Sequence, residues 1–264
     1  MRKIILMLLM LSFGEASWCY NNTYAVIVGI ADYKNDAMIN DLPYTLNNTK
    51  AIYNFLISKK GGSVPKSNIY YLTDSKATLD NIIRLSKSLF AKAKEDDRVI
   101  LYFGGHGGEG FYCPYDYDGS ASTMLFYSDI KSIFRASKSS TKLFFVDACF
   151  SGGIKTVETP SEEKSGRIAR TSKDNLNIAV MSASTGDEIS WQSGELGMGV
   201  FTYYLIKGLG GAANRDGNAY ITIQELFYYV YKKVITKTSG PDFTSVQTPQ
   251  LFGKFDLRLI VGKV

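Results

Sequence analysis

The sequence predicts an α/β domain built on a mostly parallel six-stranded sheet with helices on both faces. Short apolar runs typical of buried strands alternate along the chain with longer stretches typical of amphipathic helices. Parallel strands need a crossover between them, so this alternation favours a parallel sheet. The chain has 264 residues, of which 45% are hydrophobic and 21% charged, enough to bury one large core.

Each element is expected where its own pattern is strongest. The first strand is the nearly continuous apolar run Tyr-Ala-Val-Ile-Val-Gly-Ile, and later strands end in turns rich in glycine or polar residues. Helices are expected where apolar residues recur every three or four positions. The expected strands are 24–30, 69–73, 99–103, 142–147, 177–181 and a closing strand near 255–261, and the expected helices are near 44–58, 79–94, 128–135, 200–207 and 223–234.

Residues 1–16 have the pattern of a signal peptide. A basic pair at 2–3 precedes an apolar stretch over 4–13, and small residues precede the end of the segment. Ten apolar residues are too few to span a bilayer, so no stable membrane anchor is expected. We expect cleavage after Ala16, secretion or export to the periplasm, and a single mature domain over 17–264.

The charge and the cysteines narrow the function classes further. The formal net charge of +5 is small and scattered along the chain, which argues against nucleic acid as a partner.

The chain has three cysteines, and an odd cysteine in an exported protein indicates a reactive thiol; Cys149 is the candidate. Cys19 and Cys113 either pair with each other, or Cys113 is a small buried apolar residue. The oligomeric state is not predicted.

Two motifs that follow apolar runs carry residues suited to catalysis. His106, the single histidine of the chain, lies in Gly-Gly-His-Gly-Gly at 104–108, directly after the run 99–103. Cys149 lies in Asp-Ala-Cys-Phe-Ser-Gly-Gly at 147–153, directly after another apolar run. Side chains just past the carboxyl ends of parallel strands line the active-site crevice. We therefore expect a general acid/base and a thiol nucleophile at one edge of the sheet.

These paired motifs resemble the caspase–metacaspase superfamily of cysteine peptidases, and most closely its bacterial and metacaspase-like branch. The resemblance implies the caspase-like (caspase–hemoglobinase) fold and hydrolysis of peptide or protein substrates. It makes Cys149 the nucleophile, His106 the donor of a proton to the leaving nitrogen, and the amides of Gly107 and Cys149 the oxyanion hole. Further segments that match the family are 24–33, 112–116, 181–184 and 199–203.

The resemblance also implies a pocket for the substrate residue before the cleaved bond, the P1 residue. In metacaspase-like members the residue at the place of Asp147 helps to hold a basic P1 side chain. A second carboxylate is usual where this chain has Asn48, and Ser182 is assigned to the same pocket. Arg or Lys at P1 is therefore favoured, because one buried carboxylate still attracts a cation. A neutral or broader preference remains open, as does a purely structural Asp147 that holds loop amides.

A long polar stretch over 154–175 interrupts the pattern between two expected core strands. In the family the corresponding loop is often cut during activation. Lys164, Arg167 and Arg170 are then candidate self-processing sites. The alternative is a tolerated surface insertion.

Two other motifs are weaker. Residues 105–110 satisfy the dinucleotide-binding spacing G-x-G-x-x-G, but turn residues follow where that motif needs a helix. Residues 214–225 partly follow a calcium-binding EF-hand loop and depart from it at Asn214 and Ala219. We expect an ordinary polar turn there and no metal or other cofactor, with calcium as the alternative.

The second function class is a non-catalytic caspase-like module that binds peptides or proteins in the same cleft. The intact pair of Cys149 and His106 favours the enzyme, because a binding module has no need to keep both.

Overall fold

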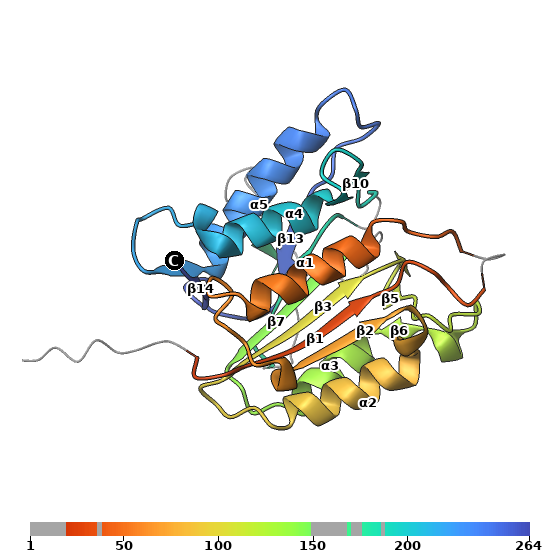
Figure 1. Ribbon diagram of the computed structural model, residues 1–264, viewed down its shortest axis with the longest axis horizontal. Helices are drawn as coiled ribbons and strands as arrows, with labels where there is room; N and C mark the ends of the chain where they lie inside the picture. Colours follow the sequence, from red (N-terminus) through yellow and green to blue (C-terminus); the bar gives the residue numbers. More distant parts are fainter. Residues whose placement is uncertain (1–19, 36–38, 149–167, 170–175, 186–187) are drawn as a thin grey trace, which may run out of the picture.

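The computed structural model describes residues 20–35, 39–148, 168–169, 176–185 and 188–264. Its strands β2, β1, β3, β7, β9, β13 and β8 lie in that order in one central sheet (Figure 1). Every pairing is parallel except that of β13 with β9, which confirms the mostly parallel sheet. The two-residue β8 adds a seventh strand at one edge. The bounds are β1 Thr23–Gly29, β2 Ile69–Thr73, β3 Arg98–Gly104, β7 Thr141–Asp147, β8 Ile168–Ala169, β9 Ile178–Ser182 and β13 Gln250–Phe252.

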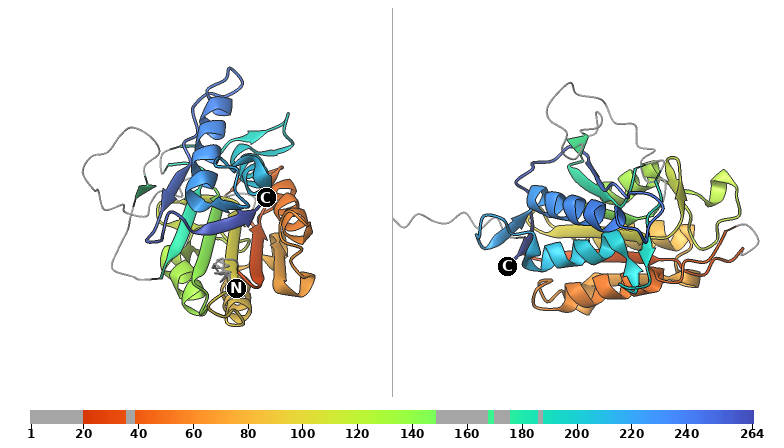
Figure 2. Two further views of the ribbon diagram at one scale, coloured as in Figure 1. Left: turned by 90° about the vertical axis from the view of Figure 1, so that its left-hand side faces the viewer. Right: turned by 90° about the horizontal axis from the view of Figure 1, so that it is seen from above.

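Helices cover both faces of this sheet, as the sequence predicts. Three of them, α1, α4 and α5, lie on one face, and α2 and α3 lie on the other (Figures 1 and 2). The expected helix from 79 to about 94 ends at Phe90, and the helix from 223 continues to Thr238. The bounds are α1 Thr45–Ile57, α2 Leu79–Phe90, α3 Tyr127–Arg135, α4 Val200–Lys207 and α5 Ile223–Thr238, with short turns η1 Lys66–Asn68, η2 Asp74–Lys76, η3 Ala121–Thr123 and η4 Gly208–Ala212.

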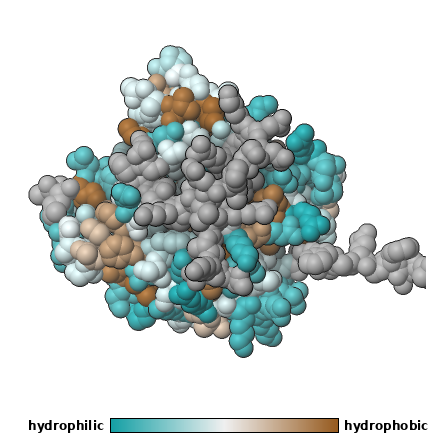
Figure 3. All heavy atoms as spheres, turned by 180° about the vertical axis from the view of Figure 1, so that it is seen from behind, coloured by the Kyte–Doolittle hydropathy of each residue, from teal (hydrophilic) through white to brown (hydrophobic). Residues whose placement is uncertain are grey.

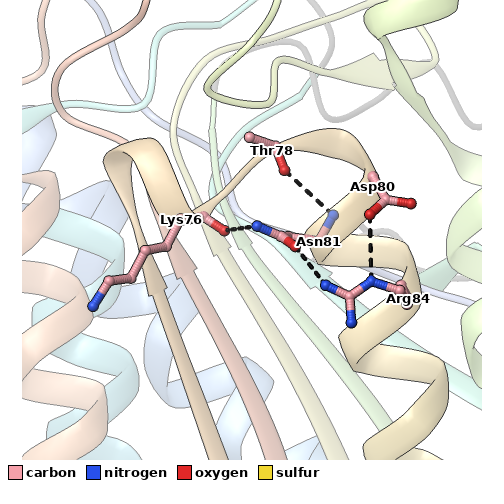
Figure 4. A network of polar contacts seen from close by, with 5 residues as sticks. All are labelled: Lys76, Thr78, Asp80, Asn81 and Arg84. Carbon is pink, nitrogen blue, oxygen red and sulfur yellow. Dashed lines mark hydrogen bonds and ion pairs between the residues drawn. The ribbon is translucent and has the colours of Figure 1, made fainter.

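Side chains fix the start of α2 after the turn η2. Thr78 accepts a hydrogen bond from the backbone N–H of Asn81 (3.3 Å), and the Asn81 amide donates to the Lys76 carbonyl (3.2 Å). Arg84 donates to both Asn81 and Asp80 (Figure 4). The Thr78 cap satisfies an N–H that has no partner inside the helix. The exposed ion pair of Arg84 with Asp80 adds little stability.

The alternation of strand side chains divides the core into two layers. In β1, Ile27 packs toward α1, α4 and α5, whereas Val26 and Val28 pack toward α2 and α3. In β7, Phe145 belongs to the layer of α1 and α4 and Val146 to the other. Asp147 has the same parity as Phe145, so its side chain points to the face covered by α1 and α4.

Short strands at the periphery complete the structure. Three of them, β4, β5 and β6, form a small antiparallel sheet directly after β3, and β10 with β11 forms a hairpin before α4. Seen from behind, the coloured surface has small separate groups of hydrophobic residues among hydrophilic ones (Figure 3). Within the described ranges, no helix is both long and apolar enough to cross a bilayer. The bounds are β4 Gly107–Gly108, β5 Phe111–Tyr112, β6 Leu125–Phe126, β10 Gln192–Ser193, β11 Met198–Gly199, β12 Tyr220–Thr222 and β14 Ile260–Lys263.

The predicted closing strand near 255–261 is wrong in position. The sheet continues at the three-residue β13, and β14 pairs instead with β12 outside the central sheet. Gly253 explains why β13 ends at Phe252, because its φ of +122° turns the chain and a Cβ there would lie 2.1 Å from the Ile178 carbonyl oxygen. A three-residue strand is too short for periodicity to predict.

Candidate active site

The register of the sheet brings the ends of the two motif-bearing strands together. In the parallel pairing of β3 with β7, Gly104 lies opposite Asp147, and the Gly105 N–H donates to the Asp147 carbonyl (3.2 Å). His106 follows Gly104 by two residues, and Cys149 follows Asp147 by two. Cys149 itself lies outside the described residues.

The backbone of His106 is fixed from two sides. Its N–H donates to the hydroxyl of Tyr33 (2.7 Å), which is buried in the core, and its carbonyl accepts from the Cys113 N–H (3.0 Å). A Cβ on Gly105 would lie 2.8 Å from the Tyr33 hydroxyl oxygen, so only glycine lets that ring approach. Tyr33 also lies beside the imidazole, with ring centroids 5.4 Å apart.

The chain after His106 forms a hairpin. Gly107 pairs with Tyr112, and Gly108 pairs with Phe111. The segment that matches G-x-G-x-x-G therefore runs into β4 and β5 and does not begin a helix. Dinucleotide binding by that motif depends on a helix N-terminus facing the pyrophosphate, so the motif is a coincidence of spacing here.

A backbone carbonyl orients the imidazole of His106. Its Nε2 lies 2.7 Å from the carbonyl oxygen of Asn40, in the segment between β1 and α1. A carbonyl can only accept, so Nε2 carries a proton and Nδ1 has the free lone pair of the neutral ring. Burial lowers the pKa of His106, and the bond to Asn40 opposes part of that effect. The imidazole is therefore neutral near pH 7 and able to accept a proton at Nδ1.

Asp147 is buried among polar groups and is 8% exposed. Its Oδ1 accepts from the hydroxyl of Ser190 (2.6 Å), and its Oδ2 accepts from the hydroxyl of Thr202 (2.5 Å) and the amide of Asn48 (3.2 Å). These donors come from a loop, from α4 and from α1, and all are uncharged. Burial raises the pKa of Asp147, and the bonds from Ser190 and Thr202 oppose the rise.

Asn48 joins Asp147 to the β10–β11 hairpin. Its Nδ2 donates to Asp147, and its Oδ1 accepts from the backbone N–H of Gly199 (2.7 Å). A Cβ at Gly199 would lie 2.5 Å from Asp147 Oδ2, so this approach requires glycine. The structure thus brings two of the sequence-predicted pocket residues, Asn48 and Asp147, into direct contact.

The third predicted pocket residue, Ser182, is buried at the end of β9. Its hydroxyl donates to the carbonyl of Ser184 (3.1 Å). Sequence reasoning missed Ser190 and Thr202. Thr202 lies in the family-matched segment 199–203, which was a usable signal, whereas nothing in the pattern around Ser190 indicated its role. Asn40 was missed because it acts through its main-chain carbonyl, which every residue type has.

Of the other predicted residues, the structure describes only some. Residues 1–16, Cys19, Lys164, Arg167 and Arg170 lie outside the described ranges. Cys113 is buried, and burial raises the pKa of its thiol to about 12, which suits the small buried apolar residue of the second alternative.

The EF-hand-like segment is a polar turn that leads into α5. Asn214 accepts from the Gly217 N–H (2.8 Å). Glu225 accepts from both the N–H (3.0 Å) and the hydroxyl (2.8 Å) of Thr222, which caps α5. Among the residues that the structure describes, no group of three or more His, Cys, Asp or Glu side chains is arranged to hold a metal ion.

Comparison with known proteins identifies the class. The model of the family described as the caspase domain matches residues 22–256. The chain belongs to this family, within the caspase–metacaspase superfamily of peptidases, and membership suggests cysteine peptidase activity. The caspase-like fold implied by the sequence resemblance is therefore confirmed.

Two curated relatives are metacaspases. The chain is 33% identical over 101 residues to Metacaspase-1 of Eremothecium gossypii, and this match covers 36% of this chain and 21% of that protein. It is 24% identical over 196 residues to Metacaspase-1A of Neurospora crassa, covering 66% of this chain and 42% of that protein. The chain thus spans less than half the length of these relatives.

A solved structure shares the fold. The crystal structure of protein GSU0716 from Geobacter sulfurreducens has a TM-score of 0.61 and 14% sequence identity, and the match covers 90% of this chain and 96% of that one.

Proposed function

We propose that this protein is an exported cysteine endopeptidase that cleaves after Arg or Lys with a Cys149–His106 dyad. The observation that supports the proposal is the pairing of Gly104 with Asp147 at the ends of neighbouring parallel strands; in the sequence, His106 follows the first by two residues and Cys149 follows the second by two.

The tautomer of His106 defines its part in the reaction. Nδ1 takes the proton of the Cys149 thiol, and the resulting thiolate forms a bond to the carbonyl carbon of the scissile peptide. The oxyanion is stabilised by the N–H groups of Gly107 and Cys149. The imidazolium then gives its proton to the leaving amine as the C–N bond breaks. Water hydrolyses the acyl-enzyme with His106 again accepting the proton.

The Asn40 carbonyl serves this cycle as a positioning group. It holds Nε2–H (2.7 Å), which keeps Nδ1 directed to the chemistry and stabilises the imidazolium that forms after thiol deprotonation. Because burial lowers the pKa of His106, the charged ring returns its proton readily to the leaving amine.

The P1 preference rests on Asp147. The groups that donate to the Asp147 carboxylate are the Ser190 and Thr202 hydroxyls, the Asn48 amide and the Thr202 backbone N–H. All are neutral, so within the described residues these donors do not compensate the charge of the ionised group, which favours a cationic P1 side chain. A P1 Asp would meet a like charge in a poorly solvated site.

A panel of fluorogenic peptides that differ only at P1 tests this function. Wild-type protein should hydrolyse the Arg and Lys peptides fastest and the Asp peptide slowest, and Cys149→Ala should hydrolyse none. Cys113→Ala is the matched control, since that buried cysteine should be dispensable for turnover. A wild type that binds these peptides without hydrolysing them would identify the non-catalytic module instead.

Export predicts a mature N-terminus close to Ser17. The basic start, short apolar stretch and small residues of 1–16 support cleavage after Ala16. N-terminal sequencing of protein recovered from the native host should begin within a few residues of Ser17. Soluble protein that retains Met1 would contradict the export proposal.

Self-processing is expected in the polar stretch over 154–175. This stretch begins shortly after Cys149 in the sequence and carries Lys164, Arg167 and Arg170, which suit an Arg/Lys-specific site. Intact-mass measurement should find wild-type protein nicked after one of these residues and Cys149→Ala whole. The same nick in both proteins would assign the cut to another protease.

A further inference from the structure

A buried chain of hydroxyl groups lies behind Asp147. The phenol of Tyr102, on β3, is 2.8 Å from the hydroxyl of Thr202, on α4, and that hydroxyl is 2.5 Å from Asp147 Oδ2. Tyr102 and Thr202 are both fully buried. The chain therefore connects the centre of the core to the carboxylate.

The direction of these hydrogen bonds follows from the number of protons. Thr202 has a single hydroxyl proton, and the carboxylate can only accept, so Thr202 donates to Asp147. Its oxygen is then the acceptor for Tyr102. Burial and the nearby Asp147 raise the pKa of Tyr102, so the phenol keeps its proton and can donate it to the hydrogen bond.

We propose that Tyr102 and Thr202 are specificity-determining positioning residues that keep Asp147 anionic and aligned for a cationic P1 side chain. This inference rests on the proposed function and adds to it two residues that do not touch substrate. We call the hydrogen-bonded series Tyr102–Thr202–Asp147 the hydroxyl relay.

The hydroxyl relay opposes the rise in the Asp147 pKa that burial causes. A buried carboxyl group with too few donors binds a proton and loses its attraction for a cation. Hydrogen bonds to the ionised form are the strong ones, and a donor that is itself hydrogen-bonded is a better donor. Tyr102 thus strengthens the bond from Thr202, and both favour the anionic state of Asp147.

The surroundings of Asp147 allow this effect to be isolated. Among the described residues, the groups that bond its carboxylate are Asn48 from α1, Ser190 from the loop after β9, and both the hydroxyl and the backbone N–H of Thr202 from α4. Behind them, β3 contributes Tyr102, whose phenol bonds Thr202 and also contacts the Asn48 side chain. Of these, only the Tyr102 phenol is titratable. His106 titrates in the same assay, so the change in the Asp147 pKa is read as the difference between the acid limbs of a basic-P1 and a neutral-P1 peptide.

The test compares Thr202→Val, Tyr102→Phe and Thr202→Ser with wild type. Valine keeps the shape of threonine without its hydroxyl, and serine restores the hydroxyl. Thr49→Val is the matched control, because Thr49 is a buried helical threonine whose hydroxyl donates within its own helix, to the Thr45 carbonyl (2.6 Å). Circular dichroism checks folding, and Tyr102→Phe tests the relay alone if Thr202→Val does not fold.

Two readouts are needed. The first is kcat/KM for matched peptides with Arg or norleucine at P1. On the acid limb, Thr202→Val should lose about tenfold on the Arg peptide and at most about twofold on the norleucine peptide, and Tyr102→Phe about threefold on Arg alone. The acid limb of the Arg profile should move up by about one pH unit in Thr202→Val, one unit being a tenfold change. Thr202→Ser and Thr49→Val should match wild type.

The second readout is independent of turnover. Agmatine, which carries the guanidinium of an arginine side chain, is titrated calorimetrically into Cys149→Ala protein with and without Thr202→Val. We expect the Kd to rise about tenfold when the hydroxyl is absent. Equal losses on both peptides, an unchanged Kd, or no agmatine binding would overturn the relay. If agmatine binding depends on Thr202 but wild-type protein hydrolyses none of the peptides, the peptidase proposal is refuted and the relay stands.

Discussion

Replacing His106 with alanine should lower peptide hydrolysis by about a thousandfold, within the range that one general acid/base supplies. His106 is the single histidine of the chain, so no neighbouring imidazole can take its place. The fold should persist, because the core contacts of this segment come from the hairpin β4–β5 and Tyr33. The measurement is kcat/KM on the Arg peptide together with circular dichroism and the thermal midpoint.

The same substitution separates two models of the site. If His106 is the proton carrier, an added small imidazole should restore part of the activity of His106→Ala at high concentration. Near-wild-type turnover by His106→Ala with an unchanged spectrum would remove the dyad from the account.

Replacing Asp147 with asparagine should abolish the preference for a basic P1 residue. Loss of one partner of a buried charge pair typically costs about 2–5 kcal/mol, which corresponds to at least roughly a thirtyfold loss in kcat/KM on the Arg peptide. The norleucine peptide should change far less. Hydrolysis of the P1 panel by Asp147→Asn checks this, and an unchanged Arg preference would assign the pocket charge elsewhere.

Asn48→Asp is the complementary variant. Asn48 Nδ2 now donates to Asp147, and this substitution would replace that donor with a carboxylate about 3 Å from the first. Two such carboxylates cannot both ionise readily without a cation between them. We expect weaker thermal stability at neutral pH and a larger ratio of Arg to norleucine hydrolysis than in wild type.

The pH profile should carry the signature of Asp147. Burial raises its pKa in the folded protein, so the carboxyl binds a proton at a higher pH than in the unfolded chain. Ionisation of Asp147 therefore costs stability as pH rises through that raised pKa, and the contribution is fully favourable only below the unfolded value. Hydrolysis of the Arg peptide should fall earlier on acidification than hydrolysis of the norleucine peptide.

Most of the fold could be predicted from the sequence, and so could the ends of the two motif-bearing strands, β3 and β7. Apolar runs such as the one before His106 are long enough to predict their strands, and parallel pairing then sets the positions of His106 and Asp147. The position of the last sheet strand, the three-residue β13, was predicted wrongly. Its pairing depends on the turn at Gly253 and on long-range contacts that no local pattern encodes.

The supporting groups of the site were harder to predict for a similar reason. Ser190 and Thr202 reach Asp147 from segments more than forty residues away in the sequence, and hydroxyl residues are common at the surface. Asn48 was expected as a pocket residue on resemblance alone. Its actual contacts, with Asp147 and the Gly199 N–H, show why an amide is accommodated there: it donates to one and accepts from the other.

Covalent capture tests the central claim most directly. A peptide chloromethyl ketone ending in Arg should alkylate wild-type protein at one cysteine, and mass spectrometry of the digested protein should locate the adduct on Cys149. The reaction should be slowed strongly in His106→Ala and in Asp147→Asn, and free agmatine should compete with it. An adduct on Cys113, or a rate on Cys149 no greater than in denatured protein, would contradict a cysteine peptidase with this site.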